Sequence, residues 1–355
     1  MATEKPELLR VEHLRQYFKS GHAVTKAVDD VSFSVKNGEI VGLVGESGCG
    51  KTTTARSVIK LYNITGGKVW FDGELISAGT WDEQEALRQA KAALKAAAPS
   101  EKAEARARLL EAKAKCREAE AQSKALRKKY PTVTQIQMIF QDPMASLNPR
   151  MTIKEIIAEG LRIRGMKDEK KINDMVMDVL GKVGLLPEHA NRYPHEFSGG
   201  QRQRIGVARA IIMEPKMIIA DEPVSALDVS IQAQVINLLG SLREEMGISI
   251  LFIAHDLSVV KYFSDRIGVM YFGHLVELAE SDELFARPLH GYTQSLLSAI
   301  PMPDPHYEKR RKRIIYQPPQ YTPEEEADLA LREIFPGHFV RCTAAEAERL
   351  KGQAQ

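Results

Sequence analysis

The pattern of hydrophobic and polar positions along residues 1–75 predicts β-structure with turns. Leu9–Leu14 (LRVEHL) places apolar residues within a polar setting, and Ala27–Val35 (AVDDVSFSV) alternates more regularly. Glu39–Val44 (EIVGLV) is almost wholly apolar and contains β-branched residues, which predicts a buried strand. The Asn-Gly pair at 37–38 is a hairpin-type turn, and Lys68–Leu75 (KVWFDGEL) predicts a further hairpin.

The pattern changes abruptly between residues 81 and 129. This stretch consists mostly of Ala, Glu, Lys, Arg, Gln and Leu, which are strong helix formers. Pro99-Ser100 interrupts it, and an acidic first turn follows Ser100, which is therefore a candidate N-cap. We predict a helical hairpin with arms at about Asp82–Ala97 and Glu101–Lys128. Its apolar face is mostly alanine, which leaves two interpretations: a solvated insertion, or an arm that binds a partner.

The second half of the chain alternates between strand and helix. Gln135–Phe140 (QIQMIF) predicts a strand, and Met151–Ile212 is mainly helical in pattern. Two short apolar strands follow at Met217–Ala220 and Ser249–Ala254, with a helix at about Ile231–Glu245 between them. Buried strands that alternate with helices predict an α/β core with a largely parallel sheet.

Proline becomes frequent after Pro288, at positions 301, 303, 305, 318 and 319. We expect a boundary near Pro288. The first domain would span 1–288 and contain the inserted hairpin at about 81–129, and 289–355 would form a small irregular appendage.

Composition limits the possible functions only modestly. The 355 residues carry a net charge of +2, too small to indicate nucleic-acid binding by itself. The three cysteines, Cys49, Cys116 and Cys342, are far apart and form no C-x-x-C pair, so neither a disulfide framework nor a structural zinc site is expected. We find no uncharged apolar run of about 18 residues and no signal-peptide core at the start. If the protein serves a membrane, we therefore expect it to act from the cytoplasmic side, through partner proteins.

The segment Gly45–Thr52 (GESGCGKT) matches the phosphate-binding pattern G-x-x-x-x-G-K-[ST] between a predicted buried strand and a predicted helix. Its glycines would let backbone N–H groups curl around phosphate oxygens, and the positive end of the helix would face the same anion. Lys51 would contact the β- and γ-phosphates of ATP, and Thr52 would hold Mg²⁺. A chance glycine-rich turn is the alternative. The expected nucleotide contacts are Gly45, Glu46, Ser47, Gly48, Cys49, Gly50, Lys51, Thr52 and Thr53.

Two further motifs accompany this loop. Met217–Glu222 (MIIADE) is an apolar strand that ends in acidic residues. In a P-loop fold Asp221 would hold Mg²⁺ and Glu222 would polarise the attacking water. Alone this motif is weak, because many strands end in acidic residues. Phe197–Arg204 (FSGGQRQR) places SGGQ before a basic helical stretch. In this order and spacing, the three motifs resemble those of ABC ATPases.

The resemblance to ABC ATPases covers about residues 8–305 and implies further roles. Gln141 in FQDP would be the Q-loop glutamine and a further Mg²⁺ ligand, and Asp228 in SALD would belong to the D-loop near the nucleotide. His255 would sense the γ-phosphate, and Phe18 would stack on adenine, with Tyr17 as the alternative. By this resemblance the catalytic residues are Lys51, Gln141, Glu222 and His255, and the signature that closes over ATP from a second subunit is Ser198, Gly199, Gly200 and Gln201.

The fold that this resemblance implies is α/β. It has a RecA-like sheet core around the P-loop, a helical lobe that carries the signature, the inserted hairpin and the C-terminal appendage. The implied cofactors are ATP and Mg²⁺. Such ATPases act in pairs, with themselves or a paralogue, on transmembrane permease subunits. We therefore expect a peripheral subunit at the cytoplasmic face of the cell membrane, with no nucleic-acid partner. Glu222, His255 and an intact SGGQ indicate a catalytically competent subunit rather than a non-hydrolysing module.

Three C-terminal phrases indicate the branch of the family. Leu289–Pro301 (LHGYTQSLLSAIP), PMPDP at 301–305 and Gly337–Cys342 (GHFVRC) resemble the ATPases of oligopeptide and dipeptide importers, which act with an extracytoplasmic peptide-binding protein. Uptake of another solute, such as nickel, is the alternative. Some members of this group carry a cysteine-rich C-terminal segment. Only Cys342 is present here, so we expect no iron–sulfur cluster.

A soluble DNA-maintenance ATPase of the SMC kind is the main rival interpretation. Those proteins also insert helical arms, but the arm here is short, lacks a C-x-x-C hook and precedes Gln141 instead of following it. Chemistry at Cys49 offers a separate hypothesis. Because Cys49 lies inside the phosphate loop, we expect its alkylation to block activity and ATP to protect it; a buried, unreactive thiol is the alternative.

Overall fold

The computed structural model describes residues 5–21, 23–225, 227–300 and 313–352. The chain divides into two compact units, which we describe separately. The first comprises Met1–Ser34, Gly48–Val133 and Phe272–His274. The second comprises Val35–Ser47, Thr134–Tyr271 and Leu275–Gln355. This division does not follow the predicted boundary near Pro288, which stays a prediction of where the ATPase domain ends.

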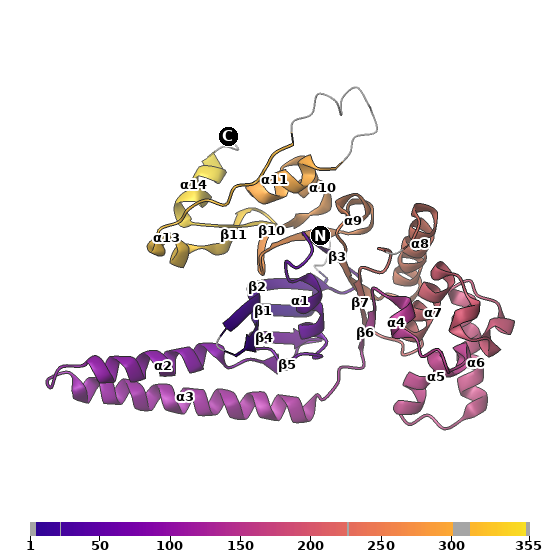
Figure 1. The fold of residues 1–355 in the computed structure, drawn as a ribbon, viewed down its shortest axis with the longest axis horizontal. Helices are drawn as coiled ribbons and strands as arrows, with labels where there is room; N and C mark the ends of the chain where they lie inside the picture. Colours follow the sequence, from indigo (N-terminus) through magenta and orange to yellow (C-terminus); the bar gives the residue numbers. More distant parts are fainter. Residues whose placement is uncertain (1–4, 22, 226, 301–312, 353–355) are drawn as a thin grey trace. The chain divides into compact units, whose positions relative to one another are not determined.

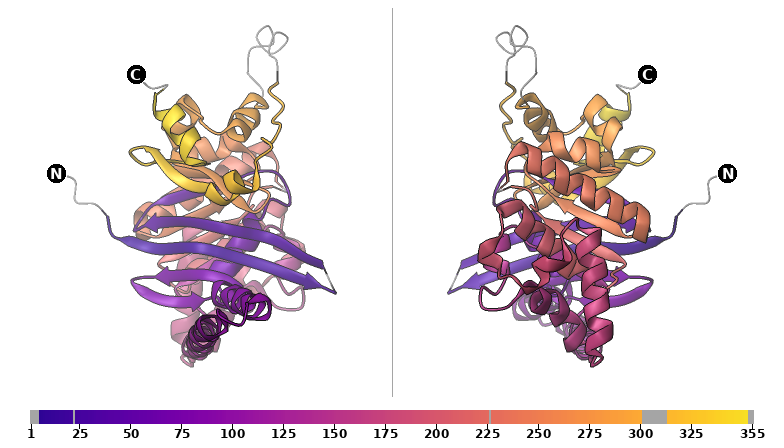
Figure 2. Two further views of the ribbon diagram at one scale, coloured as in Figure 1. Left: turned by 90° about the vertical axis from the view of Figure 1, so that its left-hand side faces the viewer. Right: turned by 90° about the vertical axis from the view of Figure 1, so that its right-hand side faces the viewer.

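A four-stranded sheet forms the first unit, in the order β2-β1-β4-β5. Its two long strands lie side by side, in indigo in Figure 2. Strand β1, in which Leu9, Val11 and Leu14 are buried, confirms the strand that the sequence predicted, and β4 and β5 confirm the predicted hairpin, which turns at Asp72-Gly73. The unit also holds helix α1. The bounds are β1 Glu7–Ser20, β2 Ala23–Lys36, α1 Lys51–Val58, β4 Gly66–Phe71 and β5 Glu74–Ala78.

The predicted hairpin at residues 37–38 is wrong. Gly38 does adopt a left-handed turn conformation, with φ 66°. However, β2 and the next strand, β3 (Ile40–Val44), belong to different sheets. The reason lies in burial: β2 alternates between buried and partly exposed residues, whereas all five residues of β3 are buried and pair with parallel strands on both sides.

The inserted hairpin is present, as helices α2 (Trp81–Ala96) and α3 (Lys102–Lys129) (Figure 1). Its observed ends lie within a residue or two of the predicted ones. Ser100, however, is not the N-cap of α3: that position is Glu101, and no side chain caps it. Near its base the arm is held by Ser123, whose hydroxyl donates to the Ala78 carbonyl at 2.8 Å.

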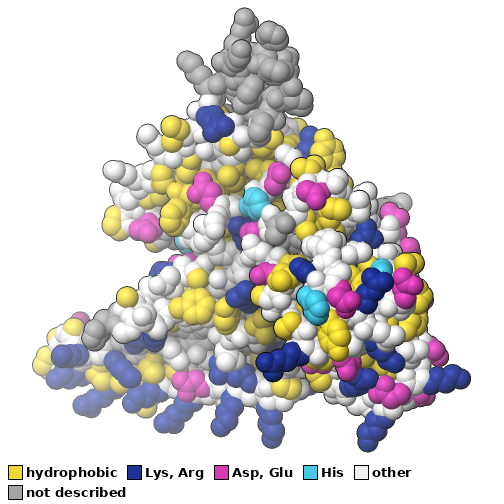
Figure 3. All heavy atoms as spheres, turned by 45° about the vertical axis from the view of Figure 1, so that its right-hand side comes forward, with side chains coloured by type: hydrophobic (Ala, Val, Ile, Leu, Met, Phe, Trp, Pro, Cys, Tyr) yellow, Lys and Arg dark blue, Asp and Glu magenta, His cyan; other side chains and the backbone are white. Residues whose placement is uncertain are grey.

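The arm is strongly basic on its exposed surface. Residues 81–129 contain thirteen Lys and Arg against eight Asp and Glu. Figure 3 shows dark blue Lys and Arg side chains along one edge of the arm. Six of them recur along α3 with an 11-residue repeat, which places them on one helical face; they are Lys102, Arg106, Lys113, Arg117, Lys124 and Lys128, all exposed. The buried positions of α3 are small: Ala105, Cys116 and Ser123.

The second unit contains an eight-stranded sheet in the order β11-β12-β10-β9-β3-β8-β7-β6. Its five strands from β9 to β6 are parallel, which confirms the predicted α/β core. β7 and β8 are buried along their whole length, as expected for strands covered on both faces. The bounds are β6 Ile136–Ile139, β7 Met217–Asp221, β8 Ser249–Ile253, β9 Arg266–Tyr271 and β10 His274–Glu280.

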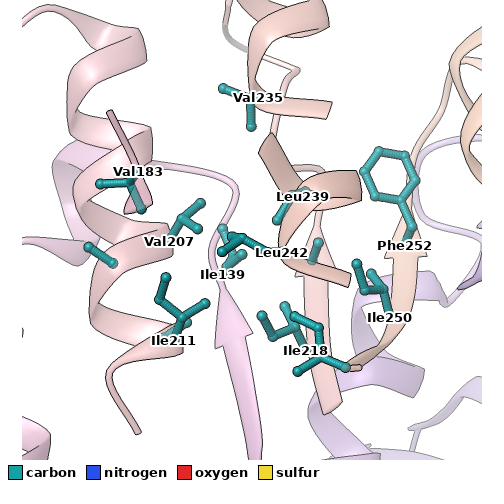
Figure 4. Packing of buried hydrophobic residues seen from close by; sticks show 14 of the residues in the cluster. Ile139, Val183, Val207, Ile211, Ile218, Val235, Leu239, Leu242, Ile250 and Phe252 are labelled. Carbon is teal, nitrogen blue, oxygen red and sulfur yellow. The ribbon is translucent and has the colours of Figure 1, made fainter. Parts of the chain in front are cut away.

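Helices of the second unit cover this sheet and form the predicted helical lobe. Figure 4 shows Val207 and Ile211 of α7 facing Leu239 and Leu242 of α8, with strand residues such as Ile218 beside them. These residues belong to one buried hydrophobic cluster, so the lobe and the sheet share a core. The bounds are α4 Pro143–Ser146, α5 Ile153–Ile163, α6 Glu169–Lys182, α7 Gly199–Ile211, α8 Val229–Met246 and α9 Leu257–Phe263.

The C-terminal appendage is more regular than predicted. Strand β12 pairs antiparallel with both β10 and β11, so the appendage extends the main sheet. The sequence pattern did not predict β11 and β12, because both strands are short and because β10, the partner of β12, lies far away in the sequence. The prolines at 301, 303 and 305 and the PMPDP phrase lie outside the described residues. The bounds are α10 Ser281–Ala286, α11 Gly291–Ser298, α13 Pro323–Asp328, β11 Ala330–Phe335, β12 His338–Cys342 and α14 Ala344–Gly352.

A buried carboxylate fixes the appendage to the sheet. Glu277 of β10 is fully buried and accepts hydrogen bonds from the backbone N–H groups of Leu289 (2.7 Å) and His290 (3.0 Å). The Nε2 atom of His338 on β12 lies 2.8 Å from the same side chain. Because each polar atom finds a partner, the buried network is compatible with a stable core. The LHGYTQ and GHFVRC phrases thus meet at Glu277.

Candidate nucleotide-binding site

The loop from Gly45 to Gly50 joins strand β3 to helix α1, the strand–loop–helix context that the sequence predicted. Gly48 has φ 82° and Gly50 has φ 108°, conformations that side chains other than glycine rarely adopt. A Cβ atom added at Gly48 would meet no protein atom within 4 Å, so the loop has open space at this point. Such a loop can present backbone N–H groups to an anion of phosphate size.

Lys51 begins helix α1, and its side chain is only 4% exposed. Its Nζ atom lies 3.8 Å from Sγ of Cys49, which is also buried. Burial raises the pKa of the Cys49 thiol, and the positive charge of Lys51 partly opposes that rise. Thr52 and Thr53, in the first turn of the helix, are partly exposed. An ammonium group is therefore present at the start of the helix, where the predicted phosphate contact requires one.

The backbone of Glu46 has a partner that sequence analysis missed. Its N–H group donates to the hydroxyl of Tyr292 at 3.1 Å. Tyr292 belongs to helix α11 and is 2% exposed. The LHGYTQ phrase contains this tyrosine, but pattern analysis cannot predict a contact between positions so far apart in the chain. The side chains of Glu46 and Ser47 are exposed beside it.

Three of the predicted catalytic side chains lie together at the ends of parallel strands. Glu222 follows β7, Gln141 follows β6, and His255 follows β8. The Nε2 atom of Gln141 donates to Oε2 of Glu222 at 2.9 Å, and Nδ1 of His255 lies 3.4 Å from the same oxygen. Carboxyl ends of parallel strands share one edge of the sheet, which explains why residues 81 or 33 positions apart converge there. Asp221, the last residue of β7, is 2% exposed.

The backbone of Glu222 is strained. Its φ angle is 45°, a left-handed conformation that is uncommon for a residue other than glycine. The conformation is held by a hydrogen bond from its N–H group to the Ile253 carbonyl at 3.0 Å. Strain of this kind concentrates at functional positions, where it fixes the direction of a side chain.

The SGGQ segment begins helix α7 with a reciprocal cap. The hydroxyl of Ser198 accepts from the Gln201 N–H group, and the Gln201 side chain accepts from the Ser198 N–H group. Ser198 and Gly199 are exposed, whereas Gly200 is buried. A Cβ atom at Gly200 would lie 2.4 Å from the Ile231 side chain, so that glycine is required for packing against α8. The exposed half of the motif is thus the part available to a ligand.

Asp228 also has a structural role. Its carboxylate caps helix α8 by accepting from the Ile231 N–H group at 3.0 Å and from the Ser230 hydroxyl at 2.7 Å. These hydrogen bonds lower the pKa of Asp228, chiefly through Ser230. The predicted role near a nucleotide stays a prediction.

The two candidate aromatic residues for adenine differ in exposure. Phe18 is 39% exposed and meets Tyr62 edge to face, with ring centroids 5.3 Å apart. Tyr17 is 7% exposed, packs against Trp81 and donates its hydroxyl hydrogen bond to Asp29. A buried ring cannot offer its face to a base, so the geometry favours Phe18.

The residues expected to hold Mg²⁺ are oxygen donors: Thr52, Gln141 and Asp221. Hydroxyl, amide and carboxylate oxygens suit this cation, which keeps several water ligands when it binds together with a nucleotide. Among the described residues, no cluster of three or more His, Cys, Asp or Glu side chains could hold a metal ion by itself. These oxygen donors fit a Mg²⁺ ion that binds together with a nucleotide.

The order of these segments along a mainly parallel sheet, with a capped SGGQ helix between them, places the chain in the class of ABC-type P-loop ATPases. The family model described as "ABC transporter" matches residues 28–132 and 116–225. The model described as "Oligopeptide/dipeptide transporter, C-terminal region" matches residues 276–327.

Relatives match over nearly the whole chain. The oligopeptide transport ATP-binding protein OppF of Bacillus subtilis is 52% identical over 97% of this chain and 98% of its own length. The dipeptide transport ATP-binding protein DppF of Lactococcus lactis is 44% identical over 99% of both chains. The chain therefore belongs to the ABC transporter family, among its oligopeptide and dipeptide transport ATP-binding proteins.

Solved structures agree on the fold. The cbiO1 protein of Clostridium perfringens, part of the ABC transporter complex cbiONQ, has a TM-score of 0.58 at 22% identity and covers 80% of this chain and 92% of that one. A dimeric ATP-binding cassette bound to ADP and Pi has a TM-score of 0.57 at 24% identity, with 77% and 99% coverage. The predicted fold class is confirmed, and so is the prediction of an ATP-binding, ATP-hydrolysing transporter subunit. The SMC interpretation is excluded.

Proposed function

We propose that this protein hydrolyses ATP to energise the uptake of oligopeptides or dipeptides through a membrane transporter. The match to the oligopeptide/dipeptide C-terminal model and the names of the full-length relatives support peptides over nickel. The catalytic part of the proposal is supported by the position of the Glu222 carboxylate, which contacts both Gln141 and His255. The strained backbone of Glu222 fixes the direction of this side chain.

In this proposal the loop Gly45–Thr52 and Thr53 bind the triphosphate of ATP. Backbone N–H groups around Gly48 and Gly50 and the N-terminus of α1 would contact the phosphate oxygens. The Lys51 ammonium would neutralise charge that develops on the γ-phosphoryl group. The ring of Phe18 would stack on adenine, because its face is more exposed than that of Tyr17.

Glu222 would orient the water that attacks the γ-phosphate in line with the leaving oxygen. The amide of Gln141 and the imidazole of His255 both reach its Oε2 atom, so they would position this carboxylate and respond when the γ-phosphate arrives. Thr52, Gln141 and Asp221 would hold Mg²⁺. When bound, this ion would spread the negative charge of the phosphates.

A second ATPase subunit would complete each site. Ser198 and Gly199 are exposed at the start of α7. They would offer a hydroxyl, backbone N–H groups and a helix N-terminus to the γ-phosphate that the partner holds. Gly200 and Gln201 would complete this signature segment. Asp228 would lie at the same interface. Arg209 of α7 donates to the Ser146 carbonyl and lies over the Phe140 ring, so the helix that begins with the signature contacts the segment around Gln141.

Within the described residues, no helix has the length and apolar character that a membrane crossing requires. We propose that the protein acts as a peripheral subunit on the cytoplasmic face of the cell membrane. It would bind transmembrane permease subunits through the region around Gln141, and it would act indirectly with an extracytoplasmic peptide-binding protein.

Substitution of Glu222 tests this function. In the complete transporter, purified with its membrane partners and reconstituted in vesicles, Glu222→Gln should retain ATP binding and trap a closed ATPase pair, because the amide cannot orient the water as the carboxylate does. ATP turnover and peptide uptake should both fall by about 100-fold or more. Glu244→Gln, at an exposed position on α8, is the matched control and should leave both rates unchanged. Normal turnover in Glu222→Gln would remove this residue from its assigned role.

A further inference from the structure

The C-terminal appendage contains a pocket that the ATPase site does not use. Its volume is about 290 Å³, close to the lower end of the range for small-molecule sites. Residues from helix α11, from the segment at 316–321, from β12 and from α14 line it. Leu289, Val340 and Leu350 supply an apolar wall, and Tyr316 and Tyr321 add aromatic surface.

The charged lining of the pocket is mainly positive. Arg341 of β12 and Arg349 of α14 both line it, and among the described residues neither forms a salt bridge with a carboxylate. The acidic lining residue, Glu346, already accepts hydrogen bonds from the Thr343 N–H group (2.9 Å) and the Tyr321 hydroxyl (3.2 Å). Two guanidinium groups beside an apolar wall form a suitable site for an anion with a hydrophobic body.

Two cationic side chains, Arg341 and Arg349, and one acidic side chain, Glu346, line the pocket, so positive groups outnumber negative ones there. Burial raises the pKa of Tyr321 to about 12, and the Glu346 charge adds to the rise, so the phenol stays neutral near pH 7. Burial likewise raises the pKa of Tyr316 and lowers the pKa of His290, which keeps both groups neutral.

A chain of ring contacts leads from the pocket to the phosphate loop. Tyr316 on the pocket wall contacts Tyr292, with centroids 5.7 Å apart, and both rings contact Tyr271. Packing is close here, since a Cβ atom at Gly291 would lie 3.2 Å from the Tyr316 ring. The hydroxyl of Tyr292 in turn accepts from the Glu46 N–H group at 3.1 Å. A shift of Tyr316 therefore has a direct path to the backbone of the loop.

We propose that this pocket binds a small organic anion and that its occupancy changes the affinity of the phosphate loop for nucleotide. Arg341 and Arg349 would hold a carboxylate or phosphate group, and the apolar or aromatic body would lie against Leu289 and Val340. Tyr316 and Tyr292 would transmit occupancy to Glu46. The coupling rests on the nucleotide role proposed above, whereas the binding of the anion does not.

Binding is tested on the full chain with four probes, with ADP present to occupy the phosphate loop. Phenyl phosphate and benzoate combine an anionic group with a ring, inorganic phosphate has only the charge, and benzyl alcohol has only the ring. Titration calorimetry should show binding of phenyl phosphate, benzoate or both at millimolar concentration, at least about tenfold tighter than benzyl alcohol. The two anions distinguish a phosphate from a carboxylate ligand. Absence of binding by both would overturn the proposal.

Substitutions identify the site of this binding. Arg341→Gln and Arg349→Gln should each lower the affinity for phenyl phosphate or benzoate, whichever binds more tightly, by about tenfold. Lys351→Gln is the matched control, because it removes one positive charge from the same helix, α14, outside the pocket. Thermal denaturation confirms that each variant is folded. Equal binding by the wild type and both arginine variants would contradict the assignment.

Coupling is measured as the change in ADP affinity on saturation with the better probe. We expect a change of about threefold or more in the wild type, and by reciprocity the same change in probe affinity on saturation with ADP. Tyr292→Phe keeps the ring contacts but removes the hydroxyl that Glu46 contacts, so the change should disappear. An unchanged ADP affinity in the wild type, or the same change in Tyr292→Phe, would refute coupling. Failure of the wild type to bind ADP at all would instead refute the proposed function and leave the anion site standing.

Discussion

Cys49 lies in the middle of the phosphate loop, with its thiol buried and 3.8 Å from the Lys51 ammonium. Two effects on its reactivity oppose each other. Burial raises the pKa of the thiol, and the lysine charge lowers it, but burial is the larger effect. Because the thiolate is the nucleophile, the structure favours the slowly reacting thiol over the reactive one that position in the motif suggested.

We therefore predict that Cys49 reacts with iodoacetamide more slowly than a free thiol at pH 7. A raised pKa means that the thiolate fraction grows with pH, so the rate should increase about tenfold per pH unit through the alkaline range. ATP should slow the reaction further, and activity should fall as Cys49 is modified. Mass spectrometry of peptides separates Cys49 from the other buried thiols, Cys116 and Cys342. Fast, pH-independent labelling, or equal loss of activity in Cys49→Ser, would contradict this account.

At the residue scale, the features that could be predicted from the sequence are those formed by residues close together in the chain. The phosphate loop was predictable because its glycines and Lys51 act within eight residues of one another. The grouping of Gln141, Glu222 and His255 needed the family resemblance, since only the sheet brings them together. The contact between Tyr292 and Glu46 could not be predicted, because a tyrosine in a helix carries no sign of its distant partner.

At the scale of elements, the α2–α3 arm has an alanine-rich contact face and a basic exposed surface. The contacts that hold it lie near its base, where Ser123 donates to Ala78 and Trp81 packs on Tyr17. Replacement of 88–110 by a short Gly-Ser turn should therefore leave the melting temperature and ATP affinity close to those of the wild type. Calorimetry measures both.

The matched comparison for the shortened arm is Ser123→Ala, which should cost about 1 kcal/mol of stability because the Ala78 carbonyl loses its partner. If the shortened arm instead lost ATP affinity, the outer part of the arm would have a role in the nucleotide site. Unchanged binding together with lost peptide transport would favour the partner-binding interpretation over the solvated one.

The link between β10 and the C-terminal appendage offers a second prediction for an element. Glu277→Gln places an amide N–H₂ group where the carboxylate accepts three hydrogen bonds, so one buried donor must lose its partner. We expect the free energy of unfolding to fall by about 2–4 kcal/mol. Glu280→Gln, at the exposed end of the same strand, should change it by less than about 0.5 kcal/mol. Chemical denaturation distinguishes the two, and equal stabilities would contradict the role of Glu277.

Element prediction succeeded where composition was strongly biased and failed where pairing was distant. The α2 and α3 helices were clear from their Ala, Glu and Lys content. Strands β11 and β12 were missed because each is short and because β12 finds its partner, β10, about sixty residues earlier. The turn at 37–38 was misread because an Asn-Gly pair determines a turn but not which sheet the next strand joins.

At the scale of the whole molecule, the parallel sheet of the second unit explains how separate motifs can serve one reaction. The loops that follow β3, β6, β7 and β8 all leave from one edge of that sheet. They carry the start of the phosphate loop, Gln141, Glu222 and His255 respectively. The alternation of apolar strands and helices predicted this sheet, but not the antiparallel extension by the appendage.

ATP affinity tests the central claim most directly: that the loop from Gly45 to Thr52 holds the phosphates of ATP. Titration calorimetry on the full chain with Mg²⁺ compares the wild type, Lys51→Ala and Lys68→Ala, the last of which removes an exposed positive charge from β4. The account predicts that Lys51→Ala lowers the affinity for ATP by about 100-fold, whereas Lys68→Ala binds ATP as tightly as the wild type does. Unchanged affinity in Lys51→Ala, in a folded protein, would contradict it.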